Sequence, residues 1–160
     1  MSNARNFARI AQNVDSSGRS SNGNNPIFRV KPKTVTANFS ATYLNSSTYW
    51  NDPVLNDGNC WDSSTGKFTA PIDGNYFFSA NLRFDAFGGS YFYMDIRKNQ
   101  ESSPREMRLL SSLTYTYHTF SLSGVIKMST NDYVQVWCNS VGDTSMSIDG
   151  DSDFVGALIS

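Results

Sequence analysis

The chain has few cysteines and only one histidine. Among its 160 residues are Cys60, Cys138 and His118. The two cysteines are far apart and lack the C-x-x-C spacing of metal and redox motifs, so we interpret them as free, half-buried thiols; a disulfide is the alternative. One histidine per chain excludes a site that needs two within one subunit, such as a multi-histidine metal site. We interpret His118, which lies within a strand pattern, as a structural residue.

Charge is also scarce. Thirteen Lys and Arg against fourteen Asp and Glu leave a net charge of −1, which predicts no basic surface for nucleic acid or for an anionic membrane. No run of 18 apolar residues occurs, so we expect no membrane insertion. The N-terminus lacks the apolar core of a secretory signal. We therefore expect assembly in a cytoplasm.

Aromatic residues, by contrast, are plentiful and alternate along the chain. They make up 14% of the sequence, and polar turn residues separate the segments that carry them. The clearest pattern spans residues 74–84, where one face is polar (Asn75, Ser79, Asn81, Arg83) and the other is apolar (Tyr76, Phe78, Ala80, Leu82, Phe84). This period of two predicts a half-buried antiparallel strand.

The same alternation recurs in several later segments. The apolar sets are Phe92, Met94 and Ile96, and then Phe120, Leu122, Ile126 and Met128. Residues 153–160 are apolar on both faces, which predicts a central strand. Residues 101–112 are expected to form a charged loop or an edge strand. Eight to ten short strands with no helix between them predict an all-β sandwich.

Residues 1–33 differ from the rest and are expected to form an N-terminal docking arm and linker, followed by one domain at 34–160. Four apolar residues, Phe7, Ile10, Ala11 and Val14, fall on one face of a short helix. A helix of this length is marginal alone, so its apolar stripe needs a partner surface. The alternative is a flexible tail with accidental periodicity.

The sequence offers little catalytic or metal-binding chemistry. Asp149, Asp151 and Asp153 alternate, as oxygen ligands of Ca²⁺ can, but no bidentate glutamate follows them. We interpret them as a solvated turn and keep them only as weak calcium candidates, with no other cofactor expected. No carboxylate has a recognisable base or nucleophile partner, so we expect no catalytic residues and no enzyme activity. A depolymerase would need paired carboxylates at glycosidase separation.

Residues 56–79 carry motifs that resemble those of a known family. This stretch contains an Asn-x-Gly turn, a Trp-Asp pair, a Gly-x-Phe-Thr-Ala-Pro corner and a Gly-x-Tyr-x-Phe strand, and further matches lie at 123–128, 132–136 and 152–160. In order and over residues 35–160, the chain resembles the C1q branch of the C1q/TNF-like globular domains. It departs from their pattern at Trp61, where tyrosine is usual, and at Ala157, where a bulky aromatic is common.

The resemblance implies a ten-strand jelly roll that assembles as a homotrimer. Both chain ends would lie at the base of the domain and the loops at its apex. The residues that carry the fold and trimer motif are Trp61, Phe68, Gly74, Tyr76, Phe78, Phe154 and Gly156.

Residues 1–10 resemble the N-terminal segment of tail-fibre and other virion proteins of marine and cyanobacterial phages, and no collagen repeat is present. We therefore expect a virion structural protein: a trimeric head whose residues 1–20 bind a capsid or tail protein. A capsid decoration (cement) protein and a short tail-fibre or adaptor protein both fit. The alternative is a module that binds a host surface glycan or protein through its apex loops. Tyr43, Tyr49 and Trp50 could stack on sugars if exposed, but we interpret them as core.

Overall fold

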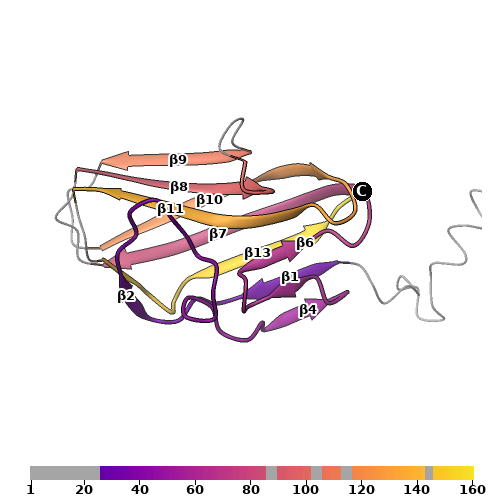
Figure 1. The fold of residues 1–160 in the computed structure, drawn as a ribbon, viewed down its shortest axis with the longest axis horizontal. Helices are drawn as coiled ribbons and strands as arrows, with labels where there is room; N and C mark the ends of the chain where they lie inside the picture. The colour runs from indigo at the N-terminus through magenta and orange to yellow at the C-terminus, as the bar shows by residue number, and fades with distance from the viewer. Residues whose placement is uncertain (1–25, 86–89, 102–105, 113–116, 143–145) are drawn as a thin grey trace, which may run out of the picture.

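The protein is a sandwich of two antiparallel β-sheets. The computed structural model describes residues 26–85, 90–101, 106–112, 117–142 and 146–160. The two sheets lie face to face and enclose one hydrophobic core between them (Figure 1). No helix occurs in these residues, and none is therefore long and apolar enough to cross a membrane.

The larger sheet has seven strands in the described residues. Its order is β2-β12-β7-β13-β1-β4, and β10 pairs with the other edge of β7. The strands are β1 (Ile27–Val30), β2 (Val35–Ala37), β4 (Leu55–Asp57), β7 (Gly74–Asp85), β10 (Tyr117–Met128), β12 (Met146–Ile148) and β13 (Asp153–Leu158).

The smaller sheet has six strands in the described residues. Its order is β5-β6-β11-β8-β9, and β3 also pairs with β11. The strands are β3 (Thr42–Tyr43), β5 (Trp61–Asp62), β6 (Lys67–Thr69), β8 (Tyr91–Lys98), β9 (Met107–Ser112) and β11 (Tyr133–Val141). As an edge strand, β9 fits one of the two expectations for residues 101–112.

Alternation decides which side chains enter the core. The apolar set predicted for residues 74–84 is buried on β7, and Phe92, Met94 and Ile96 are buried on β8. On β10 the buried residues are Phe120, Ile126 and Met128, with Leu122 packed against them. Strand β13 lies between β7 and β1, which confirms its predicted central place, although only its inward residues, such as Phe154 and Gly156, are buried within one chain. The predicted all-β jelly-roll sandwich is confirmed, with thirteen described strands because several are only two or three residues long.

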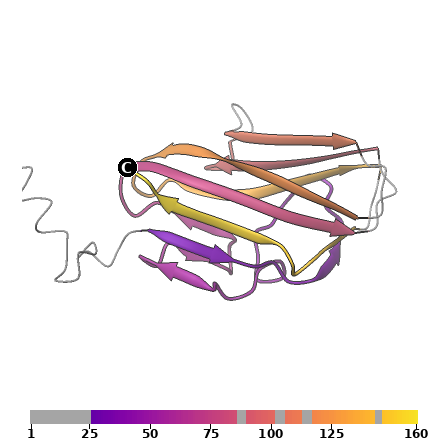
Figure 2. The ribbon, with the colours of Figure 1, turned by 180° about the vertical axis from the view of Figure 1, so that it is seen from behind.

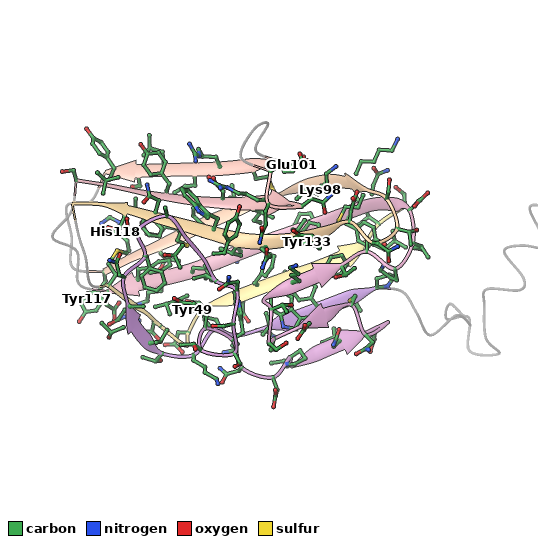
Figure 3. The ribbon with its side chains drawn as sticks, in the orientation of Figure 1. Tyr49, Lys98, Glu101, Tyr117, His118 and Tyr133 are labelled. Carbon is green, nitrogen blue, oxygen red and sulfur yellow. The ribbon has the colours of Figure 1, made fainter. Side chains whose placement is uncertain are left out.

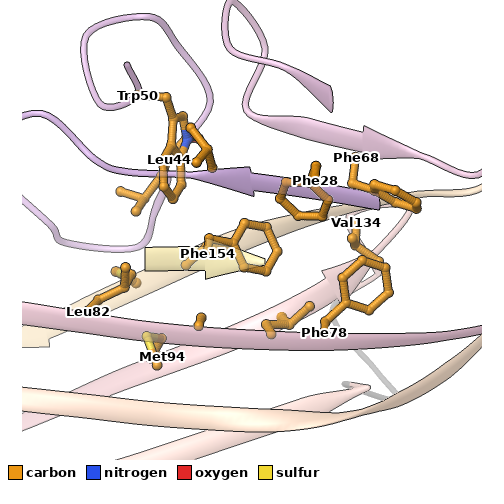
Figure 4. Packing of buried hydrophobic residues seen from close by; sticks show 14 of the residues in the cluster. Phe28, Leu44, Trp50, Phe68, Phe78, Leu82, Met94, Val134 and Phe154 are labelled. Atoms are coloured by element: carbon orange, nitrogen blue, oxygen red, sulfur yellow. The ribbon is translucent and has the colours of Figure 1, made fainter. Parts of the chain in front are cut away.

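Stacked aromatic rings fill the centre of the core (Figure 4). The Phe28 ring lies 4.8 Å from the Trp61 ring, with an angle of 4° between their planes. It also contacts Phe68 at 5.2 Å and Phe154 at 5.0 Å between ring centroids. Contacts of this kind add to the free energy gained by burying the rings. Strand β1 is therefore part of the core, and the folded domain takes in residues 27–33, ahead of the boundary placed at residue 34.

The two ends of the described chain meet at one end of the sandwich, which we call the base. The Leu158 amide donates to the Pro26 carbonyl oxygen at 2.9 Å, and the Asn75 amide donates to that of Ser160 at 2.7 Å. The opposite, distal end holds the far ends of β7, β8, β10 and β11 (Figures 1 and 2). The two ends of the domain, as far as the structure describes it, therefore lie together as expected. The loops were expected at the apex, and residues 86–89, 113–116 and 143–145 lie outside the described residues.

Candidate functional site

The outward side of the larger sheet carries a continuous row of apolar side chains. Val125 on β10 pairs with Phe77 on β7, Phe77 pairs with Ala157 on β13, and Ala157 pairs with Ile27 on β1. Each of these residues alternates with a core residue, so their side chains point away from the core. Phe77 is 39% exposed and Val125 is 57% exposed.

A second row extends this apolar surface. Val155 on β13 pairs with Arg29 on β1, and Arg29 pairs with Leu55 on β4. Between the two rows lies an apolar groove of about 200 Å³, lined by Ile27, Phe28, Arg29, Leu55, Phe77, Val155, Gly156 and Ala157. We call the outward residues Ile27, Leu55, Phe77, Val125, Val155 and Ala157 the assembly face. The small Ala157 is one of the residues that line this groove.

Polar residues mark where the assembly face ends. Toward the distal end, Arg29 Nε donates to Asp153 Oδ1 at 2.9 Å, and its Nη2 donates to Oδ2 at 3.1 Å. The hydrogen bond to Asp153 raises the pKa of the Arg29 guanidinium, so it stays charged. Level with Asp153, the outward residues of the neighbouring strands are polar: Asn81 on β7 and Ser121 on β10. An apolar patch with a polar rim is typical of a protein–protein contact.

Sequence reasoning did not single out the two most important residues of this face. The outward set predicted for β7 was Asn75, Ser79, Asn81 and Arg83, and it passed over Phe77. The sequence did contain a signal for Phe77, because an aromatic residue on the otherwise polar face of a strand points away from the core of its own domain. Val125 gives the same signal on β10, where it alternates with Gly124 and Ile126.

The predicted motif residues lie inside the domain. Trp61, Phe68, Tyr76, Phe78 and Phe154 are all buried in the core. A Cβ atom at Gly156 would lie 2.5 Å from Phe78 Cδ1 and 2.6 Å from Phe28 Cε1, and one at Gly74 would lie 2.5 Å from Leu158 Cδ1. These residues therefore specify the packing of the sandwich, and the outward residues between them form its surface.

The weak calcium candidates do not gather around one point. Asp153 is held by Arg29, and Asp149 Oδ2 lies 3.4 Å from Arg83 Nη1. Asp149 Oδ1 accepts from the Asp151 amide at 2.9 Å, as in a turn. Among the described residues, no group of three or more His, Cys, Asp or Glu side chains could hold a metal ion.

Both thiols are free and buried. Burial raises the pKa of Cys60 to about 11 and raises that of Cys138 still further, so both remain protonated and poorly nucleophilic at neutral pH. His118 lies on β10 at the distal end, next to Tyr117 (Figure 3). It stacks on Phe120 with 5.7 Å between ring centroids, as a structural residue does.

The three aromatic residues considered for sugar stacking are not free on the surface. Trp50 is buried, and its Nε1 donates to the Leu44 carbonyl oxygen at 2.6 Å. Tyr49 packs against the core and Tyr43 is half-buried beside Arg97. Their interpretation as core is confirmed for Trp50 and Tyr49. Phe7, Ile10, Ala11 and Val14 lie outside the described residues.

Comparison with known proteins places this geometry in a family. The model of the C1q domain matches residues 32–159. The globular domain of zebrafish complement 1qA is similar in structure, with a TM-score of 0.59 and 19% identity, over 84% of this chain and 98% of that one. Murine APRIL, crystallised at pH 8.5, is similar with a TM-score of 0.63 and 12% identity, over the same shares. At these identities the structural matches show a shared fold.

Proposed function

The chain belongs to the C1q domain family, and from this premise we propose that it is a homotrimeric, non-catalytic structural head of a phage particle. The observation that supports assembly into a trimer is the assembly face. It presents partly exposed aromatic and aliphatic side chains across adjacent strands of one sheet. Water-exposed apolar area of this kind is stabilised when another copy covers it.

Membership of the C1q family favours a ring of three over an open chain. Domains of the C1q/TNF type assemble as trimers, and a heterologous contact closes into a ring when its rotation permits. The groove at Ala157 would accept a side chain of the neighbouring copy, since it is apolar and open to the outside. The Arg29–Asp153 pair at its rim would set the register of that contact.

The place on a particle is proposed from the sequence of the N-terminal arm. Its apolar stripe, Phe7, Ile10, Ala11 and Val14, would bind a capsid or tail protein. The chain enters the domain at the base, beside Leu158, so an arm held at the base would leave the distal end facing outward. A capsid decoration protein and a short tail-fibre or adaptor protein both follow from this arrangement.

Deleting residues 1–20 tests the particle role. We expect the truncated protein to remain a soluble trimer that no longer joins particles, because the sandwich does not need the arm for its core. A sharper pair is Ile10→Asp, which places a charge on the apolar stripe, and Gln12→Asp, which places the same charge off it. Only Ile10→Asp should abolish co-sedimentation with particles. Normal incorporation of the deletion variant into particles would exclude the docking role of the arm. It would not contradict the proposed trimer.

A further inference from the structure

The outward side of the smaller sheet carries a second cluster, built around a buried carboxylate. Asp95 on β8 is fully buried although it points away from the core. It accepts from Arg108 Nε at 2.7 Å and from Arg108 Nη2 at 2.9 Å. It also accepts from Arg97 Nη2 at 2.7 Å and from Arg97 Nε at 3.0 Å. Among the described residues, this one carboxylate therefore binds two guanidinium groups.

The two guanidinium groups also lie over the faces of aromatic rings. The Arg97 guanidinium lies 3.7 Å from the centre of the Trp137 ring, and that of Arg108 lies 4.9 Å from the Tyr93 ring. Such stacking restricts both side chains and adds to the ion pairs. Arg108 remains 28% exposed, and its Nη1 has no partner among the described residues. The hydrogen bond to Asp95 raises the pKa of Arg108, so this group is always charged.

A shallow hollow of about 250 Å³ opens beside this cluster, lined by Tyr93, Arg108, Trp137, Asn139 and Val141. The amide of Asn139 is oriented, because its Oδ1 accepts from the Ala41 backbone amide at 2.8 Å. Its Nδ2 is therefore turned away from Ala41 and has no acceptor among the residues that the structure describes. Every hydrogen-bonding side chain that lines the hollow can donate, and no carboxylate is among the described residues that line it.

We propose that this hollow binds a carboxylate-bearing sugar, such as a uronic acid residue of a surface polysaccharide. The Arg108 guanidinium would bind the sugar carboxylate, and Asn139 Nδ2 would donate to the same group or to a hydroxyl. The Tyr93 ring would pack against the apolar face of the sugar. The hollow is smaller than the roughly 300–1,000 Å³ pockets of drug-sized ligands, so one sugar ring fits it better than a longer peptide.

The site lies on the opposite sheet from the assembly face and near the distal end, where Val141 and Tyr91 end their strands (Figure 1). It is complete within one chain. The proposed sugar site therefore depends neither on formation of the trimer nor on the proposed role in a particle. If the base is held by the arm, three such hollows would face outward around a trimer.

Saturation-transfer NMR with the full chain tests the proposal. The probes are glucuronic, galacturonic and N-acetylneuraminic acid, with glucose and galactose as neutral counterparts and an acetylated Glu-Glu dipeptide as a non-sugar acid. We expect transfer to at least one acidic sugar, little to the neutral ones and none to the dipeptide. No transfer to any acidic sugar, or equal transfer to the neutral sugars, would overturn the proposal. Transfer to the dipeptide alone would show an acidic-peptide site instead.

One matched pair of variants locates the site. Asn139→Asp keeps the acceptor for the Ala41 amide and places a carboxylate in the hollow, so affinity for the acidic sugar should fall about tenfold or more. Asn131→Asp adds the same charge at the exposed turn between β10 and β11, at the other end of β11, and should leave affinity unchanged. Equal affinity of Asn139→Asp and the unchanged chain would contradict the assignment. Thermal unfolding of both variants confirms that each is folded.

Discussion

Phe77 and Val125 stand directly opposite one another on β7 and β10, and both point out of the sandwich. A directly opposed pair of this kind is the unit of side-chain contact between antiparallel strands. Here the pair lies on the side of the sheet that no other part of the described chain covers, as the exposure of both residues indicates. The core is closed beneath it, so the pair is available to a second copy.

Val125→Asp should convert the assembly into a folded monomer. A charge on the assembly face would have to be buried without a partner when a second copy covers it, which costs more than the contact gains. Val141→Asp is the matched control, because Val141 is also an exposed valine at 41% but lies on the smaller sheet. Size-exclusion chromatography with light scattering distinguishes them. An unchanged mass for Val125→Asp would place the interface elsewhere.

Gly156→Ala should destabilise the sandwich by about 1–3 kcal/mol, because the new methyl group would press on the Phe28 and Phe78 rings. Gly150→Ala is the control, since its nearest neighbour would be Thr34 Oγ1 at 3.3 Å, a side chain that can shift. Urea unfolding in the Val125→Asp background avoids the concentration dependence of an oligomer. Equal midpoints for the two glycine variants would contradict this packing.

Phe28→Ala should cost about 3–5 kcal/mol of unfolding free energy, because it removes a fully buried ring that contacts Trp61, Phe68 and Phe154. Tyr91→Ala removes an exposed ring and should change stability by no more than about 0.5 kcal/mol. The same urea measurement reports both. A small effect at Phe28 would show that β1 is not part of the folded core.

Acid should weaken the turn between β10 and β11. Hydrogen bonds from Asn99 Nδ2 and from the Ser129 amide lower the pKa of Asp132 below its ordinary value of 3.8. Since the folded-state pKa is the lower one, this stabilisation is present above pH 3.8 and is lost as pH falls through the lowered pKa. Asp132→Asn should therefore reduce the loss of stability between pH 5 and pH 2.5. Urea midpoints across this range, with Asp57→Asn as a control, measure the difference.

The strands of the core could be predicted because their apolar residues alternate. The faces of β7, β8 and β10 were predicted from Tyr76 to Phe84, from Phe92 to Ile96 and from Phe120 to Met128, and all pack as expected. Strand β1 was missed because four residues are too few for a pattern, and its place depends on pairing with β13 and β4. Pairing between distant segments is not encoded in a local period.

The surface sites were harder to predict than the core. Phe77 could have been found, because it breaks the polar side of an alternating strand. The Asp95 cluster could not, since it joins residues of β8, β9 and β11 that only the sheet register brings together. The aromatic residues considered for sugar stacking were near in sequence, while the two aromatic residues that line the hollow, Tyr93 and Trp137, come from β8 and β11.

The mass of the unmodified protein in solution tests the central claim most directly. Sedimentation velocity over a range of concentrations should give a single species of three times the 17.8 kDa mass of one chain. The Val125→Asp variant, run beside it, should sediment at the mass of one chain. A monomer, or a dimer, for the unmodified protein at micromolar concentration would contradict assembly through this face.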